Sequence, residues 1–318
     1  MPHPMLHQGE RAVQRRAGVT ADGWGSAGVG AAVPPVAAEF LGLQRLVVIA
    51  AADESGTPWA SALTGPPGFV TAPGDRTVVA DRLPGPGDPL AGAFDGAFDG
   101  APDIGRDIGI LAIEPSSRRR MRVNGRARAD GGRLVVRTEQ VYSNCPKYIQ
   151  TRTYADTPPS TGGTAHVTGE LTADQRRWVA TADTFFIATW VAGLGADASH
   201  RGGNPGFVTV SGARRLTWPD YLGNSMYMTL GNLELEPRCG LLFLDWEHGH
   251  TLHLTGRARV DWDPVRAAAV PGAQRLVDFD VERVVQITGG LPQRWSFGKY
   301  SRFNPALEER QPCASVST

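Results

Sequence analysis

Short runs of apolar and often β-branched residues alternate along this chain with turns rich in glycine, proline and aspartate. The run 47–49 precedes the turn 53–56, and the run 76–79 follows the turn 73–75. Similar runs follow at 108–113, 121–129, 133–141, 185–187, 241–244 and 276–287. Short strands separated by such turns indicate an antiparallel barrel or sandwich, because βαβ units would need a helix between successive strands. The pattern predicts a mainly β fold with flanking helices.

Several stretches of the chain occur twice in the same order. Gly-Arg-Ala-Arg and Pro-Gly-Phe-Val each appear in two copies, at 125–128 and 256–259 and at 67–70 and 205–208. Each Gly-Arg-Ala-Arg follows an apolar run that begins with a glycine, Gly109 in the first half and Gly240 in the second. The offsets are 131 residues (256 − 125 and 240 − 109) and 138 residues (205 − 67). An ordered match at three places predicts a duplicated unit, so the chain is expected to consist of two related halves.

Helices are expected before and between the two halves. Residues 7–17 are charged and suit a short helix that ends at Gly18. Residues 172–175 read as a capping box that opens a helix through about residue 181. Residues 144–150 resemble the start of a further helix, which Ser143 or Asn144 would cap.

The length suits two domains of ordinary size. With 318 residues and 41% hydrophobic side chains, the chain can bury a core in each half. The expected division is an N-terminal helix and loop (1–36), a first β unit that serves as scaffold (37–155) and a second β unit that binds a cofactor (156–318).

Composition argues against several classes of partner. The formal net charge is zero, so no charge excess predicts binding to nucleic acid or to an anionic membrane. The three cysteines lie far apart and form neither a zinc spacing nor a disulfide framework. No stretch approaches 18 apolar residues, and the first residues lack the apolar core of a signal peptide. We therefore expect a cytoplasmic protein.

The two halves differ in the strand that precedes each Pro-Gly-Phe-Val. At the 138-residue offset Ser199 pairs with Ser61, whereas Arg201 pairs with the apolar Leu63. Both copies keep the fold signal, and only the second carries the charge. This difference predicts an anion site in the second half, with a solvated surface arginine as the alternative.

A second difference follows along the chain. The segment 216–233 is rich in amide and hydroxyl side chains, including Asn224 and Ser225, which the first half lacks at 83–87. Such donors beside an arginine suit a phosphate and a planar ring, and the alternative is a Gly/Asn-rich turn. Lys147, at the start of the expected helix 144–150, is a further candidate anion contact or else a solvated surface lysine.

At these residues the chain resembles the pyridoxamine 5′-phosphate oxidase-like, flavin-nucleotide-binding split-barrel family, and within it the branch with two such units in one chain. The more specific matching motifs are Cys-Pro-Lys-Tyr-Ile-Gln at 145–150 and Ser-His-Arg-Gly-Gly-Asn-Pro-Gly-Phe-Val at 199–208. Further matching stretches are 7–18, 53–70 and 216–246. The resemblance implies two tandem antiparallel split β-barrels with FMN in a cleft between barrels.

Carried over by position, the resemblance also implies which residues hold the flavin. They are Ser199, Arg201, Thr217, Trp218, Asn224 and Ser225, and Trp295 lies in a segment that resembles a tail near the flavin in relatives. The simple oxidases carry an Arg-Lys pair where this chain has Asn224-Ser225. That departure argues against pyridoxamine phosphate oxidase activity itself.

The leading hypothesis is an FMN-binding flavoprotein that acts as an oxidoreductase on a small molecule, with NADH or NADPH as a candidate reductant. The alternatives are a flavin or haem carrier without activity and a deazaflavin-dependent reductase. The assembly is expected to be either a homodimer or an internal pseudo-dimer of the two units. No catalytic residue is assigned.

Two other motifs are rejected as functional sites. The segment 23–28 spells GxGxxG, but no strand precedes it and no helix of useful length follows it, as a dinucleotide site would require. His248 and His250 flank a glycine in an expected hairpin turn, and His253 should face the other side of the sheet. No metal site is therefore expected.

Overall fold

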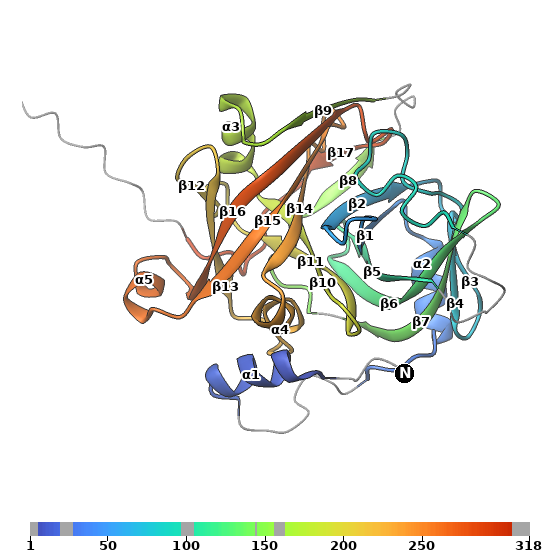
Figure 1. Cartoon of the computed structure of the whole chain (residues 1–318), viewed down its shortest axis with the longest axis horizontal. Helices are drawn as coiled ribbons and strands as arrows, with labels where there is room; N and C mark the ends of the chain where they lie inside the picture. Colours follow the sequence, from blue (N-terminus) through green and yellow to red (C-terminus); the bar gives the residue numbers. More distant parts are fainter. Residues whose placement is uncertain (1–5, 20–27, 97–104, 144, 156–162, 307–318) are drawn as a thin grey trace, which may run out of the picture.

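The computed structural model describes residues 6–19, 28–96, 105–143, 145–155 and 163–306. Two antiparallel split β-barrels lie side by side, the first drawn in blue to green and the second in yellow to red (Figure 1). The first sheet contains β1 (Leu46–Ala52), β2 (Pro58–Thr64), β3 (Val70–Gly74), β4 (Thr77–Ala80), β5 (Arg106–Glu114), β6 (Arg119–Asp130) and β7 (Arg133–Ser143). The second contains β10 (Thr184–Val191), β11 (Gly195–Gly202), β12 (Thr209–Val210), β13 (Arg215–Tyr221), β14 (Arg238–Leu244), β15 (Thr251–Asp261) and β16 (Ala273–Thr288). The predicted fold class is confirmed.

The two sheets share one strand order. It is β2-β1-β5-β6-β7-β4-β3 in the first barrel and β11-β10-β14-β15-β16-β13-β12 in the second. Replacing each strand by its counterpart in the other half converts one order into the other. In addition, β9 (Thr164–Thr168) pairs with β16, and β8 (Arg152–Ala155) pairs with β17 (Arg294–Phe297) in a two-stranded ribbon. The second half thus repeats the architecture of the first.

The repeated Gly-Arg-Ala-Arg marks the same irregularity in both sheets. The register between β6 and β7 shifts at Asn124/Gly125, and the register between β15 and β16 shifts at Thr255/Gly256. A side chain on Gly125 or Gly256 would collide with a carbonyl oxygen of the neighbouring strand. The repeated glycine is therefore the residue that a β-bulge requires at this point.

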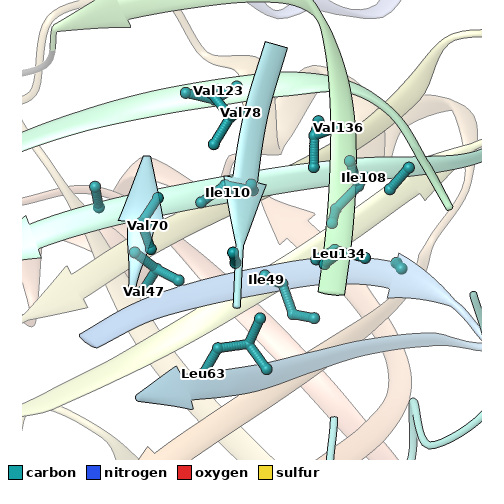
Figure 2. Packing of buried hydrophobic residues seen from close by; sticks show 14 of the residues in the cluster. Val47, Ile49, Leu63, Val70, Val78, Ile108, Ile110, Val123, Leu134 and Val136 are labelled. Carbon is teal, nitrogen blue, oxygen red and sulfur yellow. The ribbon is translucent and has the colours of Figure 1, made fainter. Parts of the chain in front are cut away.

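The innermost strands are buried on both faces, which explains their unbroken apolar runs. In β1, Val47 and Ile49 belong to the core of the first barrel, and Figure 2 shows them among side chains of β4, β5 and β7. Leu46, Val48 and Ala50 point to the opposite face and join a different cluster. The same alternation holds for β10, where Phe185 lies in the second core and its neighbour does not.

The apolar cluster that contains Leu46, Val48 and Ala50 forms the interface between the barrels. Its members from the second barrel include Phe186, Ala188, Leu242 and Leu244, which lie with the outer residues of β1, β2 and β5. A Cβ on Gly109 would lie 2.7 Å from the backbone nitrogen of Ala198 in β11. In the second barrel, a Cβ on Gly240, the counterpart of Gly109, would lie 2.7 Å from the Cα of Trp59 in β2. The glycines that begin the two apolar runs allow the backbones of the barrels to meet.

Two of the three predicted helices are confirmed. The N-terminal helix is α1 (Gln8–Arg16), and the helix between the halves is α3 (Ala173–Thr181), which begins with the predicted capping box of Thr172 and Gln175. Two helices of eight residues, α2 (Pro35–Gly42) and α4 (Met228–Leu235), and the short α5 (Pro264–Ala268) were not anticipated. No helix in the part of the chain that the structure describes is long and apolar enough to cross a membrane.

The helix predicted for 144–150 is wrong. Residues 145–150 contain a turn at Lys147 and Tyr148 and no helix, and Tyr148 has φ 65°, a left-handed conformation that interrupts a right-handed helix. The Gln150 side chain donates to the carbonyl of Tyr148 at 3.0 Å and stabilises this turn. Asn144, one of the two proposed caps, lies outside the described residues, as does most of the GxGxxG segment.

Alanine at Gly109 or Gly240 is expected to destabilise the protein by about 1–3 kcal/mol, the usual range for overpacking, because the added methyl group would force the two backbones apart. Gly42→Ala is the matched control, since nothing lies within 4 Å of a Cβ at the end of α2. Denaturant unfolding measures all three variants. Equal stabilities would contradict the assignment of these glycines to the barrel interface.

Candidate functional site

A cavity of about 110 Å³ opens between the two barrels, and we call it the interbarrel cavity. The first barrel contributes the start of β6 and residues 145–148, and the second contributes the end of β11 and residues 219–230. Four cationic side chains line it, which are Arg120, Arg122, Lys147 and Arg201. Cationic residues from both barrels therefore converge on one small space.

Arg122 is the member of this set with a direct carboxylate partner. Its guanidinium lies 2.8 Å from the carboxylate of Asp197 in β11, and both side chains are almost completely buried. The hydroxyl of Ser199 donates to Asp197 at 2.9 Å and shares a 2.7 Å hydrogen bond with Thr229. Because Arg122 comes from the first barrel and Asp197 from the second, this buried ion pair joins the two barrels at the wall of the cavity.

Arg120 has no ion pair with a carboxylate among the described residues. Its Nη1 lies 3.2 Å from Nδ1 of His200, and its buried Nε has no hydrogen-bond partner. Burial and the positive charge of Arg122 lower the pKa of Arg120. Burial and the surrounding arginines hold the pKa of His200 well below its ordinary value, so this imidazole is neutral at pH 7 and accepts from Arg120 through Nδ1. An anion in the cavity would relieve the repulsion between these cations.

Arg201 also lacks a carboxylate within ion-pairing distance in the described chain. Its guanidinium donates to the carbonyl of His200 at 3.0 Å, and burial lowers its pKa. The nearby carboxylate of Asp220 pairs instead with Arg275 at 3.5 Å. Lys147, the fourth cation, reaches the carbonyl of Leu222 at 3.5 Å. Three of the four cations thus form no ion pair with a carboxylate in the part of the chain that the structure describes.

Unusual backbone conformations gather around the cavity. Among the described residues, four that are not glycine have positive φ, and Tyr148, Ser225 and Tyr227 of these line the cavity. Each costs about 1–3 kcal/mol, and such residues cluster at binding and active sites. Tyr227 precedes α4, and no side chain caps the N-terminus of that helix. Since helix N-termini attract negative charge, α4 adds to the preference for an anion.

The N-terminal helix α1 packs against α4 and contacts the turn that precedes it at Ser225. In Figure 1, α1 lies next to α4, and the two helices meet through Gly9 and Gly231, where neither position has room for a Cβ. The Gln14 side chain donates to the carbonyl of Ser225 at 3.1 Å. Glu10, in the capping box of α1, is 1% exposed, and its Oε1 has no hydrogen-bond partner within the described part of the chain. Burial raises the pKa of Glu10 from 4.5 to about 8.

The structure brings four of the eight sequence-predicted site residues together at the cavity, and these are Lys147, Arg201, Asn224 and Ser225. Ser199 is fully buried directly behind it, where its hydroxyl bonds to Asp197 and Thr229.

The remaining three lie elsewhere. Trp218 is in the core of the second barrel against Phe185, and Thr217 donates to Asp278 on the other face of β13. Trp295 packs edge to face on Trp246 at 5.5 Å, within the ribbon of β8 and β17. The expectation that these three lie with Arg201 is corrected, because strand alternation and aromatic packing direct them away from the cavity.

Arg120 and Arg122 were missed by sequence reasoning, although a signal existed. At the 131-residue offset Arg120 corresponds to Thr251 and Arg122 to His253. Arg201 was identified in the same way, because one half has an arginine where the other half has a different residue, Leu63. His253 is buried, and its Nδ1 lies 2.9 Å from the carbonyl of Ala60.

A second cavity lies around Leu63, the counterpart of Arg201, and its lining differs in charge from that of the interbarrel cavity. Its volume is about 750 Å³, and its lining includes Asp88, which accepts from Ser61. Arg45 and Arg82 also line it, and Arg45 stacks on Tyr154 at 4.1 Å. Two arginines and one aspartate line this cavity, whereas four cations and Asp220 line the interbarrel cavity, so the excess of cations is larger in the interbarrel cavity.

Comparison with protein families finds no match, and no curated protein matches the chain. Among solved structures, the chain is similar to HupZ of Group A Streptococcus (12% identity, TM-score 0.30, 36% of this chain and 92% of that chain). It is similar to an FAD-binding protein from Mesorhizobium loti (14%, 0.28, 39% and 98%). A third is a Clostridium acetobutylicum protein related to general stress protein 26, of the pyridoxinephosphate oxidase family (10%, 0.26, 39% and 92%).

Glu10→Gln is expected to remove a pH dependence of folding. With a folded pKa raised to about 8, protonated Glu10 contributes stability that is fully present below pH 4.5 and is lost as the pH rises through 8. Glutamine keeps the capping-box hydrogen bond and cannot ionise. The variant should therefore have a higher Tm than the wild type at pH 8.5 and a flatter Tm between pH 5 and 8.5. Parallel Tm curves for the two proteins would show that Glu10 does not titrate in this range.

Proposed function

We propose that the chain binds a flavin nucleotide, FMN, through its phosphate in the interbarrel cavity and acts as an oxidoreductase. The observation that carries the proposal is the set of Arg120, Lys147 and Arg201, which line one cavity and form no ion pair with a carboxylate of the described residues. Phosphate is well matched to such a set, because a guanidinium offers two parallel N–H donors and an ammonium adds a point charge.

The residues present fit the phosphate end of a nucleotide. A volume of about 110 Å³ is smaller than the roughly 300–1,000 Å³ of complete small-molecule sites, so a planar ring would need space beyond this cavity. The unpartnered Nε of Arg120 and the uncapped N-terminus of α4 supply further donors. Asn224 and Ser225 line the same wall.

Within this proposal each residue has a separate task. Arg201 and Arg120 bind the phosphate, neutral His200 holds Arg120 in place, and the Asp197–Arg122 pair fixes the two barrels against each other. A bound flavin would supply hydride transfer to or from a small-molecule substrate, with NADH or NADPH as the candidate reductant. Because both barrels of one chain line the cavity, an internal pseudo-dimer is sufficient to form the site.

Arg201→Ala is expected to weaken FMN binding at least tenfold, because a hydrogen bond to a charged group contributes about 1.5–3 kcal/mol. The matched control is Arg257→Ala on β15, an exposed arginine of the second Gly-Arg-Ala-Arg. Quenching of flavin fluorescence measures both affinities. Equal losses in the two variants would contradict a phosphate site at Arg201, and wild-type protein that fails to bind FMN would refute the proposal.

The two alternatives give different signals in the same preparation. A Soret band in the purified protein would favour a haem carrier, and displacement of FMN by a deazaflavin at lower concentration would favour the reductase of that cofactor. Flavin binding without turnover of NADH or NADPH would favour a flavin carrier.

A further inference from the structure

A larger cavity of about 640 Å³ lies beside the interbarrel cavity, and we call it the α2 cavity. Its walls come from the segment 28–34, from α2, from the start of β6 and from the end of β7, together with Pro146. The lining is mostly apolar and includes Val36, Ala37, Phe40, Met121 and Val141. Its size falls within the ~300–1,000 Å³ range of small-molecule sites, and such a lining favours an apolar body.

The charged residues of this lining are all positive. They are Arg118, Arg119 and Arg120, and no carboxylate of the described residues lines the cavity. Arg118 is held by the carbonyls of Ile149 and Tyr300, at 2.9 and 3.2 Å. The Arg119 guanidinium stacks over the ring of Phe40 at 4.8 Å and forms no ion pair in the described chain. An anionic group on a ligand would therefore find cations at the edge of an apolar space.

Arg120 belongs to the linings of both cavities. Its Nη1 contacts His200 on the interbarrel side, and its buried Nε has no hydrogen-bond partner among the residues that the structure describes. Tyr142 also lines the α2 cavity, and its hydroxyl reaches Arg122 of the interbarrel cavity at 3.3 Å. A molecule in the α2 cavity would thus lie next to one held in the interbarrel cavity.

We propose that the α2 cavity is the substrate site of this protein and that it takes an organic anion with an apolar ring or chain. The apolar body would pack on Phe40, Met121 and Val141, and the anionic group would lie at the Arg118–Arg120 edge. This assignment rests on the proposed function, because a substrate must lie beside the cofactor. It adds a class of substrate that the interbarrel cavity alone does not define.

Val36 offers a test that leaves the fold intact. It lines the α2 cavity, is 62% exposed and directly follows Pro35 in the first turn of α2. Val265, which is 76% exposed, directly follows Pro264 in the first turn of α5 and does not line the cavity. Aspartate is well tolerated in a first helical turn, so Val36→Asp and Val265→Asp form a matched pair.

The probes are 8-anilinonaphthalene-1-sulfonate and its uncharged analogue N-phenyl-1-naphthylamine, whose fluorescence reports binding. Val36→Asp is expected to weaken sulfonate binding at least fivefold and to affect the uncharged analogue less, since the new carboxylate repels the anion. Val265→Asp should change both affinities less than twofold, and FMN affinity should be unchanged in both variants.

Equal sulfonate affinities in the two variants would overturn the proposal, and equal losses for both probes in Val36→Asp would overturn the preference for an anion. A matching loss of FMN affinity in Val36→Asp would also overturn it, because the flavin ring itself would then occupy the α2 cavity. The proposed function fails separately, through the FMN titrations of wild type and Arg201→Ala. If the wild-type protein binds the sulfonate but not FMN, the proposed cofactor is wrong. The α2 cavity would then bind anions but would not be a substrate site.

Discussion

The arrangement of the whole molecule depends on the close approach of two backbones at the interface between the barrels. Gly109 lies against β11 and Gly240 lies against β2, and neither position has space for a side chain. This double contact sets the distance between the sheets, so the outer residues of the innermost strands can form one continuous apolar cluster. The interface is as much a core as the interior of either barrel.

The same contact places the functional residues. Asp197 and Ala198 are neighbours in β11, and Ala198 is the residue that Gly109 approaches. Asp197 therefore comes within 2.8 Å of Arg122 from the other barrel. With that ion pair formed, Arg120 two residues away in β6 is carried toward His200. The cluster of cations is thus a consequence of how the barrels pack, and the buried carboxylate of Asp197 limits its electrostatic cost.

Much of the fold could be predicted from the sequence, because strand length, turn residues and the repeated motifs are local signals. The repeat also identified Arg201 by comparison with Leu63. The predictions that failed depend on long-range packing or on an unusual backbone conformation. Tyr148 adopts a left-handed conformation that no propensity predicts, and Trp218 turns into the core because of its place in the alternation of β13. Arg120 belongs to the other half of the chain, so only the packing of the barrels reveals that it lines the same cavity as Arg201.

The covalent connection between the two barrels has a consequence for the evolution of such sites. Two identical subunits related by a two-fold axis would carry two identical clefts, and every substitution would alter both. Here both partners are parts of one polypeptide, so each cleft can change independently. In this chain one cleft is lined by Arg120, Arg122 and Arg201, and the other by Asp88 and Leu63. Asymmetry of this kind is open only to a fused pair, or to two subunits encoded separately.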